Sequence, residues 1–173
     1  LKEHRFELYC QPIVAAYGDG DAGPAMEVLV RLRNDAGEHV SPADFLQAAE
    51  RYRLMGLIDR QIVQTTFDAL GRGAITLPAS RSIGINISGQ TLADAQFLEF
   101  VVECFDAPGA IPAHVCFELA ESAVIANLDQ ARRFIGVLHG MGCRFALDDF
   151  GSGLGSFSNL KLLAVDFLKI DGS

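Results

Sequence analysis

The sequence is short of basic residues and contains no cluster of them. Its 14 lysines and arginines are outnumbered by 22 aspartates and glutamates, so the net charge is -8 at pH 7. Proteins that bind the phosphate backbone of a long nucleic acid carry a basic patch or stripe. The composition therefore argues against such binding, whereas acidic side chains gathered in a pocket would bind divalent cations.

Long apolar runs and paired-cysteine motifs are also missing. No run reaches the roughly 18 residues that cross a membrane, and no basic segment precedes an apolar one as in a signal peptide. The cysteines show neither a CxxC motif nor zinc-site spacing, so we interpret them as reduced structural residues; they are Cys10, Cys104, Cys116 and Cys143. All except Cys104 fall in apolar runs and are expected in the core. We expect a cytoplasmic domain, with any membrane anchor elsewhere in the parent protein.

Half of the residues are hydrophobic, which is enough for a buried core, and their spacing alternates between two patterns. Short β-rich or apolar runs predict strands over residues 6–14, 25–32, 81–88, 114–119, 143–147 and 165–170. Stretches that look helical lie between them, over residues 41–52, 54–71, 91–105, 127–141 and, in a short piece, 157–163. Residues 17–24, rich in glycine and aspartate, are expected to form a loop.

Strands that alternate with helices of about ten or more residues predict βα units and a largely parallel sheet. The sheet is expected to form a barrel, because polar residues lie within or at the ends of separate strands, and strand ends meet at one mouth of a barrel. These residues are Glu27, Asn86, Glu118 and Asp148. The predicted fold class is α/β, a modified (β/α)8 TIM-type barrel with about six of eight βα units in this chain.

The most informative segment is an apolar strand that ends in Asp148 and Asp149, followed by a glycine-rich loop. Adjacent carboxylates repel each other and lose solvation, so they need a cation or hydrogen-bond donors around them. Paired divalent metal ions would meet this need. The alternative is an aspartate that caps a helix beside a glycine turn, and the pair alone leaves both interpretations open.

Further oxygen-bearing residues favour the metal site. Glu27 lies among apolar neighbours, and Glu118 ends an apolar strand with Glu121 close behind it. Buried charges need a partner or a metal ion, and the amide oxygen of Asn86 suits a hard cation. Each of these residues alone has a structural explanation, but their recurrence at successive strand ends is harder to explain that way.

Lys169 is a cation within an apolar strand. It either extends to solvent or pairs with Asp171, or it works in a site crowded with carboxylates and metal ions. In such a site the ammonium could orient an attacking water or stabilise charge on a phosphoryl oxygen. We favour the second interpretation.

Taken together, the motifs resemble the ordered series of the EAL domain family, and the resemblance runs through essentially all 173 residues. In order, they are Gln11-Pro12-Ile13, Glu27-Val28-Leu29-Val30-Arg31, Pro42 with Phe45 and Ala49-Glu50, Asn86-Ile87-Ser88, Glu118-Leu119-Ala120-Glu121-Ser122, Asp148-Asp149-Phe150-Gly151-Ser152-Gly153 and Lys169-Ile170-Asp171. The resemblance implies a barrel that binds two Mg²⁺ or Mn²⁺ ions and hydrolyses cyclic di-GMP to linear pGpG, which lowers this second messenger in bacterial signalling.

The resemblance also assigns the metal ligands. It implies that one ion is held by Glu27, Asn86, Glu118 and Asp148. Asp148 would bridge to the second ion, which Asp149 would bind. These ligands would act together with Lys169, which would contact the attacking water.

Substrate binding and loop contacts are implied in the same way. Gln11, Leu29 and Arg31 would line the dinucleotide pocket, with Arg31 meeting a phosphate. Glu121 would act in catalysis by steadying the loop 150–157, and this loop would also contribute to a homodimer. Sensory or GGDEF domains would be linked to this domain in the parent protein.

The sequence departs from the family pattern at several points. Val28 stands in the signature tripeptide where Ala is usual, and Ala120 replaces the usual Thr. The last two strands, which carry a further glutamate and glutamine in the family, are expected to be missing, so residues 1–173 would be an incomplete domain from a larger protein.

Two other functions stay open on the sequence alone. Some EAL domains act as cyclic di-GMP receptors without catalysis, although such receptors typically lose ligands that are all present in this chain. An unrelated metal-dependent α/β barrel enzyme would fit the carboxylates but not the motif series.

Overall fold

The computed structural model describes residues 5–16, 23–151 and 163–172. Its strands are β1 (Phe6–Pro12), β2 (Pro24–Arg33), β3 (His39–Val40), β4 (Ser82–Ile87), β5 (Val115–Ala120), β6 (Arg144–Phe150) and β7 (Phe167–Ile170). Its helices are α1 (Pro42–Arg51), α2 (Met55–Gly71), α3 (Gly89–Leu92), α4 (Ala95–Cys104), α5 (Glu121–Ala126) and α6 (Leu128–Met141), with a 3-10 turn at Pro112–His114.

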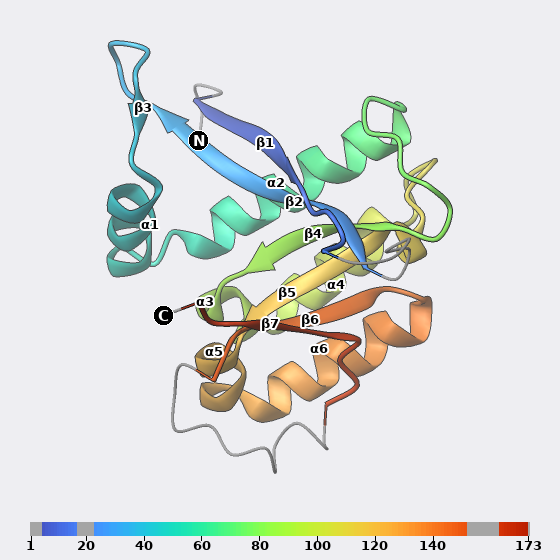
Figure 1. Cartoon of the computed structure of the whole chain (residues 1–173). Coiled ribbons are helices and arrows are strands. Elements are labelled where there is room, and N and C mark those ends of the chain that lie inside the picture. The colour runs from blue at the N-terminus through green and yellow to red at the C-terminus, as the bar shows by residue number, and fades with distance from the viewer. Residues whose placement is uncertain (1–4, 17–22, 152–162, 173) are drawn as a thin grey trace.

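These strands form one sheet in the order β1-β2-β4-β5-β6-β7, and β3 pairs with β2. Strands β2, β4, β5, β6 and β7 are parallel neighbours, so the predicted largely parallel sheet is confirmed. Helices α2, α4 and α6 lie along one side of the sheet (Figure 1). This arrangement matches part of a (β/α)8 fold.

Strand β1 departs from the predicted βα pattern, because it runs antiparallel to β2. The sequence predicts no helix between these two strands. A parallel neighbour needs a crossover of about a dozen residues or more, usually a helix, whereas an antiparallel neighbour does not. The first strand therefore joins the sheet as a hairpin partner of β2 rather than as part of a βα unit.

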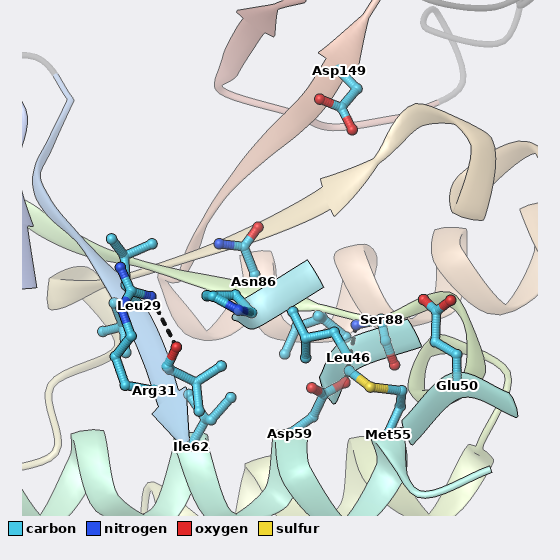
Figure 2. A pocket seen from close by; sticks show the side chains of 14 residues that line it. Leu29, Arg31, Leu46, Glu50, Met55, Asp59, Ile62, Asn86, Ser88 and Asp149 are labelled. Carbon is cyan, nitrogen blue, oxygen red and sulfur yellow. Dashed lines mark hydrogen bonds between the residues drawn. The ribbon is translucent and has the colours of Figure 1, made fainter. Parts of the chain in front are cut away.

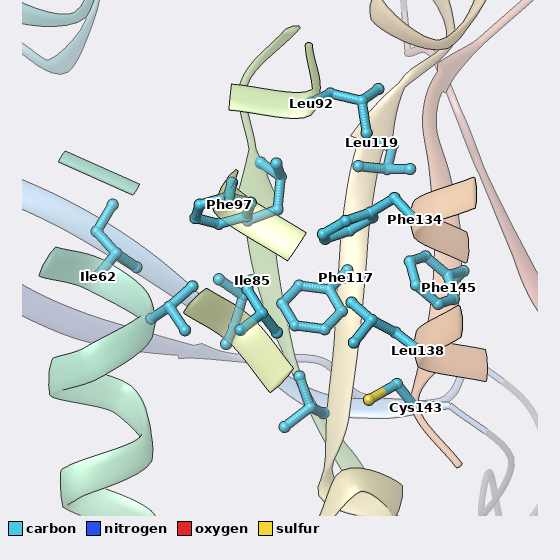
Figure 3. Close-up of a cluster of buried hydrophobic side chains, with 14 of the residues drawn as sticks. Ile62, Ile85, Leu92, Phe97, Phe117, Leu119, Phe134, Leu138, Cys143 and Phe145 are labelled. Carbon is cyan, nitrogen blue, oxygen red and sulfur yellow. The ribbon is translucent and has the colours of Figure 1, made fainter. Parts of the chain in front are cut away.

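The core lies between the parallel strands and the helices (Figure 3). Alternate residues of β5 are fully buried on this side, and Phe117 of β5 contacts Phe134 of α6 and Phe145 of β6, with ring centroids 5.5 and 5.8 Å apart. Residues in a strand point alternately to opposite faces. Glu118, next to Phe117, therefore faces away from this aromatic cluster.

Some predicted elements need correction. The single helix predicted over 91–105 is divided into α3 and α4, because Asp94 caps α4 through a hydrogen bond from the Gln96 amide. Helix α5 was not predicted as a separate element. The short helix predicted over 157–163 falls almost entirely outside the described residues.

Three of the cysteines are buried, as Cys104, Cys116 and Cys143, but Cys10 is exposed. The prediction that Cys10 packs in the core is wrong, because it lies on β1 at the end of the sheet order, where β2 is its one neighbour among the described strands. No helix in the described part of the chain is long and apolar enough to cross a membrane.

Candidate active site

Lys169 on β7 lies at the centre of a group of carboxylates from other strands. Its Nζ is 2.5 Å from Oε2 of Glu118 on β5, 3.0 Å from Oδ2 of Asp148 on β6 and 3.2 Å from Oε2 of Glu27 on β2. Burial alone would lower the pKa of Lys169, but its hydrogen bond to Glu118 and the charges around it raise that pKa above its usual value. The ammonium therefore stays charged and points into the cluster rather than out to solvent.

Glu118 is the most buried member of this carboxylate cluster, with a side chain that is 0% exposed. Burial raises its pKa to about 6; the Lys169 ammonium opposes this shift, and the carboxylates of Glu27 and Asp148 add to it. Its Oε2 is bonded to Lys169, but its Oε1 is buried and has no hydrogen-bond partner in the described part of the chain. A buried carboxylate oxygen without a donor is a position that a cation would satisfy.

Asn86 joins the cluster through Glu27. Its Nδ2 donates a hydrogen bond of 2.6 Å to Oε1 of Glu27. The register of the sheet brings these side chains together. Glu27 pairs with Gly84, two residues before Asn86, and Asn86 itself pairs with Glu118. Rotation of the amide by half a turn would exchange its nitrogen for its oxygen and turn a donor into a metal ligand.

The two adjacent aspartates are directed to different places. The pairing of β6 with β7 shifts register between Leu147 and Phe150, and Asp149 has a φ of 52°, in the left-handed region. Such a bulge redirects side chains near a site, and aspartate tolerates this backbone conformation better than most residues. Asp148 reaches Lys169, whereas Asp149 lines a neighbouring cavity.

That neighbouring cavity has a volume of about 420 Å³ (Figure 2). It is lined by Leu29, Arg31, Asn86 and Asp149 among others. Arg31 donates a hydrogen bond of 2.9 Å from Nη1 to the carbonyl oxygen of Val30. This pocket combines apolar walls with one cation and several oxygen-bearing groups, which is typical of a site for a polar ligand.

Gln11 lies in a second cavity of about 420 Å³, which it shares with Glu27, Glu118 and Lys169. The predicted substrate-binding residues are therefore divided, since Leu29 and Arg31 line the first cavity and Gln11 lines the second. Glu27 faces Asn86 on one side and Lys169 on the other, so the carboxylate cluster lies between the two cavities.

Glu121 begins α5 and is 7% exposed. Its Oε2 accepts a hydrogen bond of 3.1 Å from the backbone amide of Gly151, at the start of the loop that follows the aspartate pair. Residues 152–157 of this loop lie outside the described residues, so its predicted dimer contacts stay a prediction.

Within the described ranges, no three or more histidine, cysteine, aspartate or glutamate side chains are grouped in a way that could hold a metal ion. Three of the carboxylates instead accept hydrogen bonds from the ammonium of Lys169. The donor set still fits a divalent cation, since it offers carboxylate and amide oxygens and the buried Oε1 of Glu118 has no donor.

Comparison with known proteins decides the family, because the EAL domain model matches residues 1–173. The chain belongs to the EAL domain family. Cyclic di-GMP phosphodiesterase PdeB of Shewanella oneidensis is 37% identical to this EAL domain over 175 residues, which span 99% of this chain and 20% of that protein. Cyclic di-GMP phosphodiesterase PdeF of Escherichia coli is 32% identical over 173 residues, which span 100% of this chain and 22% of that protein. The chain spans about a fifth of the length of these curated relatives.

Solved structures support the fold of the EAL domain. The FimX EAL domain of Pseudomonas aeruginosa, bound to c-di-GMP, superposes with a TM-score of 0.86 at 30% identity, covering 99% of this chain and 67% of that chain. The phosphodiesterase PaMucR, in complex with c-di-GMP, gives 0.85 at 27% identity over 98% of this chain and 68% of that chain. The predicted TIM-type fold class is confirmed.

One buried residue near the site was missed by sequence reasoning. Asp59 of α2 is 2% exposed, burial raises its pKa, and its Oδ2 accepts a hydrogen bond of 2.9 Å from the Ser88 amide. This bond fixes the turn after β4, two residues beyond Asn86. The available signal was an acidic residue between Ile58 and Ile62 on the apolar face of a predicted helix.

Proposed function

We propose that this EAL domain hydrolyses cyclic di-GMP to linear pGpG with the help of two divalent cations, Mg²⁺ or Mn²⁺. The observation that carries the proposal is the meeting of carboxylates from three strands at Lys169, with one oxygen of Glu118 buried and unpartnered among the described residues. The names of PdeB and PdeF, both cyclic di-GMP phosphodiesterases, support the same reaction.

The residues present fit the first cation. Glu27, Glu118 and Asp148 would hold it with the amide oxygen of Asn86, and Asp149 would hold the second ion. Bound divalent cations lower the pKa of a water molecule and neutralise charge that develops on phosphoryl oxygens. In this arrangement the ions would compete with the ammonium of Lys169 for the carboxylates, and Oε1 of Glu118, which Lys169 does not bond, would be available to the first ion.

Lys169 and Arg31 would then act on the substrate. With cations sharing its carboxylate partners, the ammonium of Lys169 would be able to hydrogen-bond the attacking water or a phosphoryl oxygen. The guanidinium of Arg31 lines the adjacent cavity and would pair with a phosphate, while Leu29 provides an apolar wall. Gln11 would contact the dinucleotide from the second cavity.

Binding without turnover is the second candidate function. Its binding part is supported by the likeness to the FimX EAL domain, which is bound to c-di-GMP and has 30% identity with this chain. A homodimer through the loop after Asp149, and linkage to sensory or GGDEF domains, stay predictions about the whole protein.

The decisive experiment measures pGpG formation from cyclic di-GMP by the intact protein with Mn²⁺ or Mg²⁺, and with a chelator. Mutation of a residue that hydrogen-bonds a metal ligand typically lowers metal affinity or activity by about 10-fold to 100-fold. Glu27→Gln removes the charge of a proposed ligand itself, so it is expected to lower turnover by more than about 100-fold. Glu99→Gln, the same change at an exposed helix position, is expected to leave turnover unchanged.

The outcomes separate the candidates. Metal-dependent pGpG formation that Glu27→Gln abolishes supports the phosphodiesterase. Tight binding of cyclic di-GMP by the native protein, with no pGpG formed at any metal concentration, makes the domain a receptor.

A further inference from the structure

Gly84 lies in the middle of β4, on the face of the sheet that carries the carboxylate cluster. The alternate residues Ile83, Ile85 and Ile87 point to the opposite face and are buried there. Glycine weakens the interior of a strand, and its presence often marks a close approach by another group. The group that approaches Gly84 is the side chain of Glu118 on the neighbouring strand β5.

A side chain at Gly84 would occupy the space that Glu118 now fills. A Cβ built on Gly84 would overlap Oε1 of Glu118 and would lie 2.9 Å from its Cδ and 3.6 Å from its Cγ. The carboxylate therefore lies across the backbone of β4, where only a glycine leaves room for it.

Glu118 has little freedom to move aside. Its side chain is 0% exposed, and its Oε2 is held 2.5 Å from the ammonium of Lys169. Its Oε1, the atom nearest to the missing Cβ, is buried without a hydrogen-bond partner in the described part of the chain. A displacement large enough to admit a Cβ would change both the bond to Lys169 and the direction of this oxygen.

We propose that Gly84 is a positioning residue, whose missing side chain forms the slot that holds the Glu118 carboxylate in place for a cation. Strand β4 thus contributes to the site in two ways, since Asn86 supplies an amide group and Gly84 supplies space. Gly84 makes no contact with the substrate or the cation, and acts only through Glu118.

A double-mutant cycle tests the slot without any metal ion. Gly84→Ala is expected to lower the urea midpoint of the intact protein when Glu118 is present. In the Glu118→Ala background, where the overlapping atoms are gone, the same change is expected to have less than about half that effect, because contacting residues couple. Gly136→Ala, in helix α6 with no atom within 4 Å of the added Cβ, is the matched control and is expected to leave the midpoint unchanged or raise it.

Cation binding provides a readout that a purely structural role would not change. Calorimetric titration with Mn²⁺ is expected to show affinity weakened by about 10-fold to 100-fold in Gly84→Ala, and native affinity in Gly136→Ala. This arm rests on the proposed metal-dependent function. If the native protein binds no Mn²⁺, the proposed function fails, while the stability cycle still decides the role of Gly84.

Each outcome of the stability cycle is informative. Equal losses of stability from Gly84→Ala in both backgrounds would overturn the proposal, because the effect would then not pass through Glu118. If Gly84→Ala alone does not fold, a folded Gly84→Ala/Glu118→Ala protein supports the slot, and an unfolded one contradicts it.

Discussion

On one face of the parallel sheet, β5 and β6 bury phenylalanines against the helices, and on the other the same strands direct carboxylates at Lys169. Phe117 and Glu118 are consecutive residues of β5, and both are almost fully buried. The phenylalanine is stabilised by contact area and ring packing, whereas the glutamate depends on an ammonium and carries an oxygen unpartnered among the described residues. One face is thus stabilised by apolar packing, whereas the other is held by ion pairs that leave one buried carboxylate oxygen without a partner among the described residues.

The largest effect is expected from a substitution in the apolar face. Phe117→Ala removes a ring that contacts Phe134 and Phe145, so it is expected to lower the free energy of unfolding by about 3–5 kcal/mol. Urea denaturation followed by circular dichroism measures this loss. Tyr52→Ala, at a side chain that is 70% exposed, is the control and is expected to change stability by less than about 0.5 kcal/mol. Similar losses in both variants would contradict the assignment of the core.

A smaller effect is expected at the centre of the polar face. Lys169→Met leaves Glu27, Glu118 and Asp148 without their shared ammonium, so it is expected to destabilise the metal-free protein by about 1–3 kcal/mol. Mn²⁺ is then expected to raise the melting temperature more in Lys169→Met than in the native protein, because the ion no longer displaces an ammonium. Thermal unfolding in chelator and in Mn²⁺ measures both quantities.

The control for Lys169→Met is Arg132→Met, which removes one positive charge at an exposed position of α6. It is expected to respond to Mn²⁺ as the native protein does. A larger Mn²⁺ effect in the native protein than in Lys169→Met would show that the ammonium helps the ion to bind rather than competing with it.

The smallest expected effect is a pH dependence of stability that comes from Glu118 on the polar face. The pKa of Glu118 rises from an ordinary value of 4.5 to about 6 in the folded protein, so between these values the native state binds more protons than the unfolded state. The stabilising contribution of this group is therefore present below about pH 4.5 and is lost as the pH rises through about 6, by at most about 2 kcal/mol. Glu118→Gln, which cannot titrate, is expected to lack this decline.

Urea denaturation in chelator between about pH 4 and pH 7 measures the difference between native protein and Glu118→Gln. That difference is expected to shift in favour of the glutamine variant as the pH rises. Glu99→Gln, at an exposed position, is expected to show the same pH dependence of stability as the native protein. A pH-independent difference for Glu118→Gln would mean that burial does not perturb this carboxyl.

The elements best predicted from sequence are those whose pattern is local. The parallel strands follow from apolar runs, and α2 and α6 from long segments between them that look helical. The division of the helix predicted over 91–105 was missed because it depends on Asp94 capping α4. The exposure of Cys10 was missed because it depends on the position of β1 in the sheet. Sequence periodicity describes a segment but does not state which neighbours cover it.

Residue types and their places at strand ends determined, without any coordinates, that acidic groups and a lysine belong to one site of an EAL domain. The tertiary structure alone decided that Lys169 takes the carboxylates of three other strands as partners, and that Asp148 bonds to Lys169 whereas Asp149 lines a cavity. It also decided that Asp59 accepts a hydrogen bond from the Ser88 amide and that Gly84 leaves room for the side chain of Glu118. The reason is physical. A motif fixes which groups are present, whereas strand register, a bulge and the space left by one glycine fix where their atoms meet.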